Sequence, residues 1–352
     1  MKCESVRLIE IRNFEDKTIH FGGGLTIFKG NNGVGKTNIL EAVCLASLGK
    51  SFRTGSDEEM IRFGKEEGTV ILDYHVRGVT HQIKIKLARN QGKKIFINET
   101  PSKKKDLVGL FRTVIFTPDE LQLVKGAPQV RRRFIDMEIS QVSPRYYEEI
   151  IRYGRAVQQR NAAFKMAQIK GKKPEVDMWD MQIARGAAYI VKKRKQSLKK
   201  MNIYLSTMEA VLTGEAENLE INYKKSGGNH DSEEWYLEKL AEKREEDARF
   251  CHTSIGPHRD DLLFKMNGKD LSAYGSQGQQ RTAILAMKLG GLEFIKEETG
   301  EYPVLLLDDV GSELDEKRKN ALFSYLKEKE IQALVTTAGN SVEEIGGEEI
   351  EL

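Results

Sequence analysis

The stretch GNNGVGKT, residues 30–37, decides how the rest of the sequence is interpreted. Four residues separate its first glycine from Gly-Lys-Thr, which is the spacing of a phosphate-binding loop. A strand-like run at 25–28 precedes the loop. The apolar face of a helix follows it, at Ile39, Leu40, Val43 and Ala46. Because glycines let backbone N–H groups turn towards a phosphate at a helix N-terminus, the stretch predicts a nucleotide site between a strand and a helix.

Each position of this loop has an expected role. We expect ATP contacts from Gly30, Asn31, Asn32, Gly33, Val34, Gly35, Lys36, Thr37 and Asn38. Lys36 is expected to bring positive charge to the β- and γ-phosphates and so to take part in catalysis. The hydroxyl of Thr37 is a predicted ligand of Mg²⁺. The sequence therefore predicts ATP and Mg²⁺ as the bound nucleotide and metal.

A second chemical element lies near the C-terminal end of the sequence. Val304–Leu307 is a continuous apolar run, which is typical of a buried parallel strand, and Asp308 and Asp309 follow it directly. An acid at the end of such a strand, beside a phosphate loop, holds Mg²⁺, and this is the role expected for Asp308. Asp309 occupies the position where a carboxylate orients the attacking water. We therefore predict an ATPase with Asp309 as a catalytic residue.

The third element is YGSQGQQR, residues 274–281, ahead of a helical pattern. It predicts a second anion-binding helix N-terminus. The stretch resembles the signature motif of ABC-type ATPases, with Gln277 in place of the first glycine of the usual Ser-Gly-Gly-Gln. The resemblance implies that the γ-phosphate of ATP held by the other subunit is contacted by Ser276, Gln277, Gly278 and Gln279.

Three smaller features bear on the same resemblance. The sequence SELD, residues 312–315, resembles the D-loop of the ABC family, with Ser312 and Asp315 as its site residues. The family usually has Glu where this chain has Asp309, and the shorter side chain predicts slow hydrolysis. The switch histidine of the family has no counterpart in the sequence, and Thr337 is a candidate for sensing the γ-phosphate in its place.

The segments between the motifs predict a second lobe. Apolar residues recur every three or four positions along two long stretches between residues 126 and 252, which predicts amphipathic helices. A break at 171–174 predicts that these helices form an antiparallel pair, and a third helix is expected at about 232–250. The fold class is therefore α/β: an ABC-type ATPase head with a phosphate loop and a mixed sheet that includes an antiparallel part. The head comprises 1–125 and 253–352, and the helical arm at 126–252 is inserted as a second lobe.

Composition narrows the class of protein. The chain has 352 residues, of which 31% are charged and 39% hydrophobic, as in ordinary globular proteins. Its apolar runs are all shorter than the roughly 20 residues needed to span a bilayer. Three widely spaced cysteines give neither a disulfide framework nor a metal motif. We therefore expect a cytoplasmic protein that is not embedded in a membrane.

Further stretches are similar to one family in particular, the RecF family of SMC-like ATPases. They span the whole chain and read GKTNILEA (35–42), SFRT (51–54), RRFID (132–136), QRN (159–161), GPHRDDL (256–262) and LLDDV (306–310). This resemblance implies an ATP-dependent homodimer that acts on DNA in recombinational repair, replication and the SOS response. It also implies that RecO, RecR and RecA are partners, with RecA loaded at single-strand gaps.

The residues themselves give a weaker indication of DNA binding. The net charge is only +3, so the overall charge does not indicate a nucleic-acid partner. A basic cluster at Arg131, Arg132 and Arg133 is a candidate DNA-binding site, because arginine contacts phosphates without reading bases. We therefore expect sequence-nonspecific binding to duplex or gapped DNA.

Two other classes of function stay open at this point. One is an ABC-type ATPase subunit that drives a membrane partner, against which the long helical arm and the missing switch histidine count. The other is a DNA-processing enzyme such as a nuclease. Against it, the sequence has no separate acidic cluster for metal beyond Asp308 and Asp309.

Overall fold

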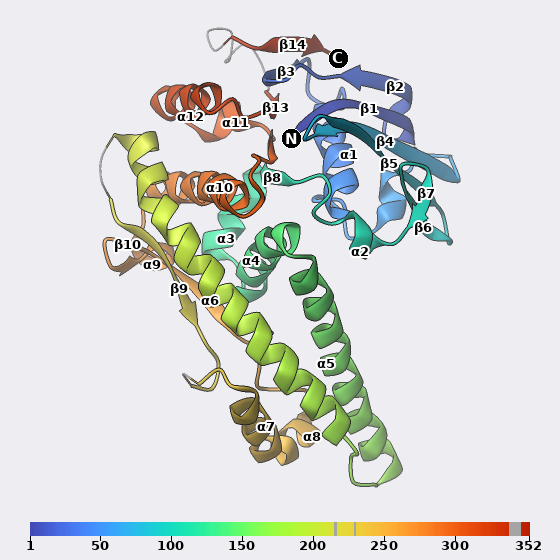
Figure 1. The fold of residues 1–352 in the computed structure, drawn as a ribbon, viewed down its shortest axis with the longest axis vertical. Helices are drawn as coiled ribbons and strands as arrows, with labels where there is room; N and C mark the ends of the chain where they lie inside the picture. The colour runs from blue at the N-terminus through green and yellow to red at the C-terminus, as the bar shows by residue number, and fades with distance from the viewer. Residues whose placement is uncertain (215–216, 229, 338–345) are drawn as a thin grey trace. The chain divides into compact units, whose positions relative to one another are not determined.

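The protein, shown as a computed structural model in Figure 1, is described over residues 1–214, 217–228, 230–337 and 346–352. Its chain forms two compact units. Unit 1 comprises Met1–Leu121, Tyr204–Glu217 and Ser276–Leu352. Unit 2 comprises Gln122–Ile203 and Asn218–Gly275. The architecture is the predicted α/β ATPase head with an inserted, mainly helical lobe.

A parallel sheet organises unit 1. Its strands run in the order β14 (Glu348–Glu351), β3 (Leu25–Lys29), β13 (Ala333–Thr336), β12 (Val304–Leu307) and β8 (Thr113–Phe116), and every neighbouring pair is parallel. All residues of β8, β12 and β13 are buried, as the continuous apolar runs predict. Because the carboxyl ends of parallel strands meet at one edge, the segments that follow β3, β12 and β13 come together there.

A separate antiparallel sheet forms the other part of unit 1. Its strand order is β2 (Phe14–His20), β1 (Lys2–Ile11), β4 (Glu67–Val76), β5 (Val79–Ala88), β6 (Gly92–Ile97) and β7 (Thr100–Ser102). Alternate side chains of its central strands are buried, among them Leu8, Leu72 and Ile85. The antiparallel part of the head is therefore a sheet of its own, beside the parallel one.

One helix joins the two sheets of unit 1. Helix α1 (Lys36–Leu48) begins directly after the phosphate loop and contacts strands of both sheets. Longer helices of the C-terminal part are α10 (Gln277–Thr299) and α12 (Glu316–Glu328). The remaining short helices are η1 (Asp57–Met60), α2 (Lys104–Leu107), η2 (Pro118–Glu120) and α11 (Val310–Glu313).

Unit 2 contains the predicted helical pair. Helix α5 (Pro144–Lys170) ends at Gly171, whose left-handed φ of 60° closes it, and α6 (Asp177–Thr213) then begins. The two helices run side by side within unit 2 (Figure 1), and the last residues of α6 belong to unit 1. Helices α3 (Leu121–Lys125) and α4 (Pro128–Val142) precede the pair.

The expected third helix of the arm is two helices. They are α7 (Glu233–Glu242) and α8 (Arg244–Phe250), and Lys243 separates them. None of the described helices of the chain is long and apolar enough to cross a membrane.

A three-stranded sheet in unit 2 explains a difference from the predicted domain boundaries. Its order is β11 (Lys269–Asp270), β10 (Asp261–Met266) and β9 (Leu219–Lys224). Because β10 pairs with β9 along its length, residues 253–275 lie in unit 2 and not with the head, where 253–352 was predicted to lie. A tight turn at Asn267 and Gly268 connects β10 to β11, and both residues have positive φ values of 51° and 77°. Helix α9 (Leu271–Tyr274) ends the unit.

Candidate nucleotide site

The phosphate loop lies between β3 and α1, as predicted. Its three glycines, Gly30, Gly33 and Gly35, all have positive φ values, which side chains disfavour. At Gly35 the packing also demands glycine, because a Cβ atom there would lie 2.7 Å from Cζ of Phe14. Gly35 is the N-cap of α1, so the backbone of the loop turns directly into the helix N-terminus.

Lys36 lies inside the loop. Its side chain is buried, and its Nζ donates hydrogen bonds to the carbonyl oxygens of Gly30 at 2.6 Å and Asn31 at 3.0 Å. Among the described residues no carboxylate pairs with this ammonium group. The positive charge is therefore held in place by carbonyl dipoles and is available to a phosphate.

Asp308 is joined to the loop through two hydroxyl groups. Thr37 Oγ1 and Thr336 Oγ1 each donate to Oδ1 of Asp308 at 2.8 Å, and Asp308 is buried. The structure thus brings together Thr37 and Asp308, the two predicted Mg²⁺ ligands. Mg²⁺ takes hard oxygen ligands, often one or two from protein with phosphates and water completing the set, so these residues fit it. In the described part of the chain no group of three or more His, Cys, Asp or Glu side chains is arranged to hold a metal.

Asp309 has an uncommon backbone conformation. Its φ of 50° and ψ of 41° are left-handed, and its backbone N–H donates to Thr336 Oγ1 at 2.9 Å. This conformation separates the directions of the two acids, since Asp308 faces Thr37 while Asp309 lines a pocket. The arrangement suits two different roles for neighbouring carboxylates.

The pocket at this edge has a volume of about 370 Å³. It is lined by Asn32, Gly33, Gly35, Lys36, Thr37, Asn38, Arg53, Asp309, Thr336 and Thr337. Most of these positions were expected to bind ATP. The prediction missed Arg53, although the stretch SFRT that contains it had been singled out as a family resemblance.

Arg53 belongs to a chain of hydrogen bonds that braces the loop. Its Nη1 donates to Asn38 Oδ1 at 2.8 Å, and Asn38 Nδ2 donates to Asn13 Oδ1 at 2.8 Å. Asn13 Nδ2 then donates to the carbonyl oxygen of Val34 at 2.7 Å. Arg53 therefore adds a second positive charge to the pocket and also helps to fix α1 and the loop. Asn13 and Asn38 cannot be connected to each other from sequence spacing alone.

A buried ion pair supports the same region from behind. Arg12 Nε and Nη2 donate to the two carboxylate oxygens of Glu41 at 2.9 and 2.7 Å, and Glu41 is fully buried in α1. Ser51 Oγ also donates to Glu41. A two-point arginine–carboxylate contact fixes orientation as well as distance. Glu41 thereby positions the segment that carries Arg53.

The signature residues form a well-capped helix start. Ser276 is the N-cap of α10: its Oγ accepts from Gln279 N at 3.2 Å, and its own N–H donates to Gln279 Oε1 at 3.0 Å. Ser276 and Gln277 are exposed. Residues 276–279 are absent from the described residues that line the phosphate pocket. Within one chain, the two predicted ATP-contacting sets are therefore separate.

The predicted D-loop, residues 312–315, spans the end of α11 and the N-cap of α12. Ser312 is in α11, and its side chain lies outside the described residues. Asp315 is the exposed N-cap of α12, where its Oδ1 accepts from Arg318 N at 2.9 Å. This capping contact accounts for Asp315 within one chain.

The arginine cluster at 131–133 has mixed roles. Arg131 makes a two-point contact with Asp261 at 2.7 and 3.0 Å, and Arg132 donates to the carbonyl oxygen of Asp260 at 2.6 Å. Burial is the main cause that lowers the pKa of the Arg132 guanidinium. These two residues join α4 to the start of β10, and Arg133 is exposed on α4. Within one chain, Arg131 and Arg132 thus hold α4 against the start of β10, and DNA binding by the cluster stays a prediction.

The stretch QRN supports the arm from inside. Arg160 is fully buried, and its Nε donates to Asp180 Oδ1 at 2.6 Å while its Nη1 donates to Asp247 Oδ2 at 2.5 Å. Asn161 Oδ1 accepts from the backbone and the hydroxyl of Thr253 at 2.7 and 2.8 Å. These contacts join α5, α6 and α8, so the stretch is structural within unit 2.

The stretch GPHRDD is structural in the same sense. His258 Nε2 lies 3.0 Å from the carbonyl oxygen of Thr253, which can only accept, so Nε2 carries the proton. Nδ1 then accepts from the hydroxyl of Tyr153 at 2.5 Å. Burial lowers the pKa of His258 to about 4, so the ring is neutral at physiological pH. His258 thus serves as a buried connector in unit 2.

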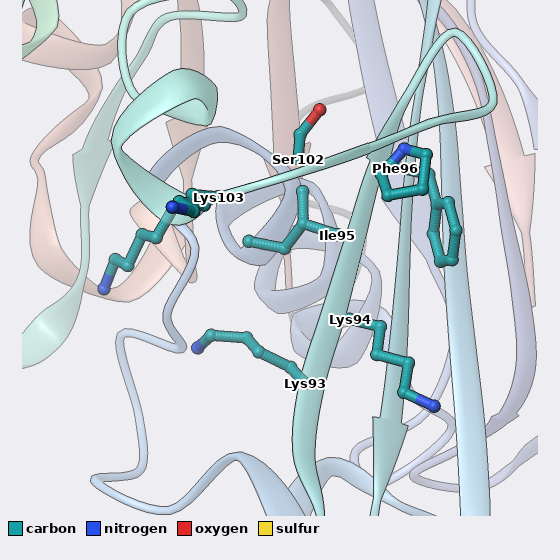
Figure 2. Close-up of a pocket in the computed structure, with 8 residues that line it drawn as sticks. Lys93, Lys94, Ile95, Phe96, Ser102 and Lys103 are labelled. Carbon is teal, nitrogen blue, oxygen red and sulfur yellow. The ribbon is translucent and has the colours of Figure 1, made fainter.

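A larger pocket in unit 1 is a weaker candidate for a functional site. It has a volume of about 550 Å³ and is lined by Lys93, Lys94, Ile95, Phe96, Pro101, Ser102, Lys103 and Lys104. Figure 2 shows that Lys93 and Lys94 point to opposite sides of β6. Lys93 Nζ is held by Asp57 and by the carbonyl oxygen of Gly49. The lysines do not converge on one point, so the smaller phosphate pocket is the better candidate site.

Comparisons with known proteins identify the family of this chain. The model of the family described as "RecF/RecN/SMC N terminal domain" matches residues 2–349. The chain is 39% identical over 344 residues to "DNA replication and repair protein RecF" of Alkaliphilus oremlandii, which covers 96% of this chain and 93% of that relative. It is 40% identical over 349 residues to the protein of the same name from Listeria innocua, covering 97% and 94%.

A solved structure is also similar over nearly the whole chain. It is described as the recombination mediator protein RecF with ATP in the RecFOR pathway. The TM-score is 0.91 at 32% sequence identity, with 99% of this chain and 95% of that chain covered. The chain belongs to the RecF family.

Proposed function

We propose that this RecF-family chain is an ATP-dependent DNA-binding protein of recombinational repair and replication that dimerises around ATP. The observation that carries the proposal is the joining of the phosphate loop to the acidic strand, where Thr37 and Thr336 share one oxygen of Asp308 at 2.8 Å. Lys36 and Asp309 line the same pocket. The names of the curated relatives support the process, and the ATP-bound relative supports the nucleotide.

The side chains of the pocket suit ATP hydrolysis. Lys36 and Arg53 bring positive charge to the phosphates. Thr37 and Asp308 hold Mg²⁺, which when bound neutralises charge on the β- and γ-phosphates. Asp309 orients the attacking water through its carboxylate. Because Asp is one methylene shorter than the Glu usual in ABC ATPases, the water is held less closely, and we expect slow turnover.

The separation of the signature residues from the pocket supports a composite site. Ser276 caps α10 and is exposed, whereas Lys36 is buried in the loop. A two-fold dimer brings the pocket of one chain to the Ser276, Gln277, Gly278 and Gln279 of the other. The γ-phosphate then makes contacts that ADP cannot make, so ATP favours the dimer and hydrolysis releases it.

The proposed dimer binds DNA. Arginine and lysine contacts to phosphates make such binding sequence-nonspecific and salt-dependent. From the resemblance to the RecF of the RecFOR pathway, we infer that the chain acts with RecO and RecR to load RecA at gapped DNA. An ATPase subunit of a membrane partner is the alternative, and association with a membrane protein in place of DNA would favour it.

The test measures retention of the purified protein on gapped and intact duplex DNA with ATP, with ADP and without nucleotide. We expect retention with ATP only, and a longer lifetime on DNA for Asp309→Asn, which binds ATP but does not hydrolyse it. Asp16→Asn, which loses a surface ion pair with Arg7, is the matched control and should behave as wild type. Equal retention under all three nucleotide conditions would overturn the proposed cycle.

A further inference from the structure

The hydroxyl of Thr337 is a buried polar group of the phosphate pocket that the proposed function does not use. Thr337 follows β13 directly, is 1% exposed and lines the pocket. Its Oγ1 has no hydrogen-bond partner among the described residues. A buried hydroxyl without a partner destabilises a protein, and most native structures avoid it. The group therefore calls for a partner that binds in the pocket.

The neighbouring Thr336 shows what the usual arrangement is. Its Oγ1 donates to Asp308 Oδ1 at 2.8 Å and accepts from Asp309 N at 2.9 Å, so both of its hydrogen-bonding roles are filled. Thr336 and Thr337 have the same side chain and both are buried beside the same pocket. Only Thr337 has a hydroxyl without a partner among the described residues. The missing partner is therefore not a general property of threonines beside this pocket.

The position of β13 places Thr337 between the two halves of the site. β13 lies between β3, which leads into the phosphate loop, and β12, which leads into Asp308 and Asp309. The backbone N–H of Thr337 donates to the carbonyl oxygen of Phe28 in β3 at 3.4 Å. Lys36 and Asp309 line the same pocket. A group bound between the lysine and the acid would therefore lie beside this hydroxyl.

A glycine keeps the space around the hydroxyl open. A Cβ atom added to Gly311 would lie 3.0 Å from Thr337 Oγ1, closer than ordinary packing allows. Gly311 belongs to α11, the short helix that follows Asp309. The hydroxyl is thus next to the helix that continues into the D-loop.

We propose that Thr337 Oγ1 is the group by which this chain distinguishes ATP from ADP. The hydroxyl donates a hydrogen bond to the terminal phosphate of ATP, which ADP lacks, and its position beside Gly311 places the difference next to α11. This inference rests on the proposed function, because it assumes that ATP binds in the phosphate pocket. Thr337 thus determines the specificity for ATP, a role that we assign to neither Lys36 nor Asp308.

The test compares two substitutions at Thr337. Thr337→Val keeps the shape and removes the hydroxyl, and Thr337→Ser keeps the hydroxyl. We expect Thr337→Val to reduce the preference for ATP over ADP by about tenfold or more, since hydrogen bonds to charged groups are among the stronger ones. The affinity for ADP should stay as in wild type. Thr337→Ser should retain the preference, and Gly311→Ala should weaken it by crowding the hydroxyl.

A second measurement separates this role from a structural one. Without nucleotide, Thr337→Val should melt at the same temperature as wild type or higher, because it removes an unsatisfied buried group. The matched control is Thr113→Val in β8 of the same sheet, where Oγ1 donates to Ser47 Oγ at 2.9 Å. That variant should lower the melting temperature and leave the ATP preference unchanged.

The outcomes are distinguishable from failure of the proposed function. If wild type binds neither ATP nor ADP, the proposed function is wrong. If wild type prefers ATP and Thr337→Val prefers it equally, with equal turnover, the assignment of Thr337 is overturned while the proposed function stands. A large loss of melting temperature in nucleotide-free Thr337→Val would also overturn it, since the hydroxyl would then have a structural partner.

Discussion

Arg160 in unit 2 and Lys36 in unit 1 are both buried, but their charges are balanced in different ways. In unit 2, Arg160 is fully buried between Asp180 and Asp247, so each charge has an opposite one within the protein. In unit 1, the buried ammonium of Lys36 bonds only to carbonyl oxygens of its own loop. The charge of Arg160 is therefore balanced within the protein, whereas the charge of Lys36 can be balanced by a bound anion.

This difference separates family-like stretches that form a candidate site from those that stabilise the fold. In the sequence, the stretches QRN (159–161) and GPHRDD (256–261) resemble the RecF family, as the stretch that begins in the phosphate loop does. Their polar atoms, however, are used up by contacts with neighbouring helices and strands. A stretch is therefore a candidate site when its polar groups face a pocket, and a structural element when they face each other.

The largest expected effect concerns the charges of unit 2. Arg160→Met leaves the carboxylates of Asp180 and Asp247 without their shared partner, and we expect a loss of about 3–5 kcal/mol in the free energy of unfolding. Urea denaturation measures it. The control on the same helix is Arg152→Met, whose exposed ion pair with Glu149 is worth about 1 kcal/mol or less. Equal stability of the two variants would contradict the distinction drawn between the units.

The phosphate loop should show the reverse pattern. Lys36→Ala should weaken ATP binding by about 10- to 100-fold, because a charged hydrogen bond to phosphate is lost. The free energy of unfolding should change little, since no carboxylate is left unpaired. Fluorescent-nucleotide titration and urea denaturation measure the two effects. Lys29→Ala, which removes a surface pair with Glu349, is the control and should bind ATP normally. A variant of Lys36 that unfolds easily but binds ATP well would refute this comparison.

Acid should destabilise unit 2 through His258. The folded pKa of about 4 lies below the ordinary value of 6.5, so the unfolded chain binds more protons between these values. Stability is therefore fully present above pH 6.5 and is lost as the pH falls towards 4. From pH 7.5 to 5 we expect a loss of about 2 kcal/mol from this residue. His258→Gln should show a smaller loss over that range in urea denaturation, and an identical loss would rule out this source.

The smallest effect separates the arginines of one cluster. Arg133→Ala should reduce the slope of log affinity against log salt by about one unit, without loss of stability. Arg131→Ala should lower stability, because its two-point contact with Asp261 is lost. DNA binding at several salt concentrations, together with urea denaturation, checks both. A change of the salt slope in Arg131→Ala alone would show that Arg131, and not Arg133, contacts DNA.

Much of the site could be predicted because its chemistry is local. The loop spacing fixes the positions of Lys36 and Thr37, and an apolar strand ending in Asp308 predicts its neighbour in the sheet. The parallel order of β3, β13 and β12 then places these residues close together, because it brings the carboxyl ends of the strands to one edge of the sheet.

The parts that were missed depend on contacts between distant segments. Arg53 reaches the pocket through Asn38 and Asn13, which no spacing connects. Arg131 and Arg133 are the same residue type two positions apart, and only burial tells the structural one from the exposed one. Strand β9 alternates Leu219 and Ile221 with polar residues, but its six residues are a short signal between two helical patterns. Its pairing with β10 moved the boundary between the units.

Sedimentation velocity tests whether two chains complete the nucleotide site together. The protein is measured with ATP, with ADP and without nucleotide, as wild type and as Ser276→Arg. We expect a dimer for wild type with ATP only, and a monomer for Ser276→Arg that still binds ATP. Ser232→Arg, which changes the N-cap serine of α7 in the same way, is the control and should dimerise with ATP. A monomer under all three conditions, with full ATPase activity that Ser276→Arg leaves intact, would rule out the composite site.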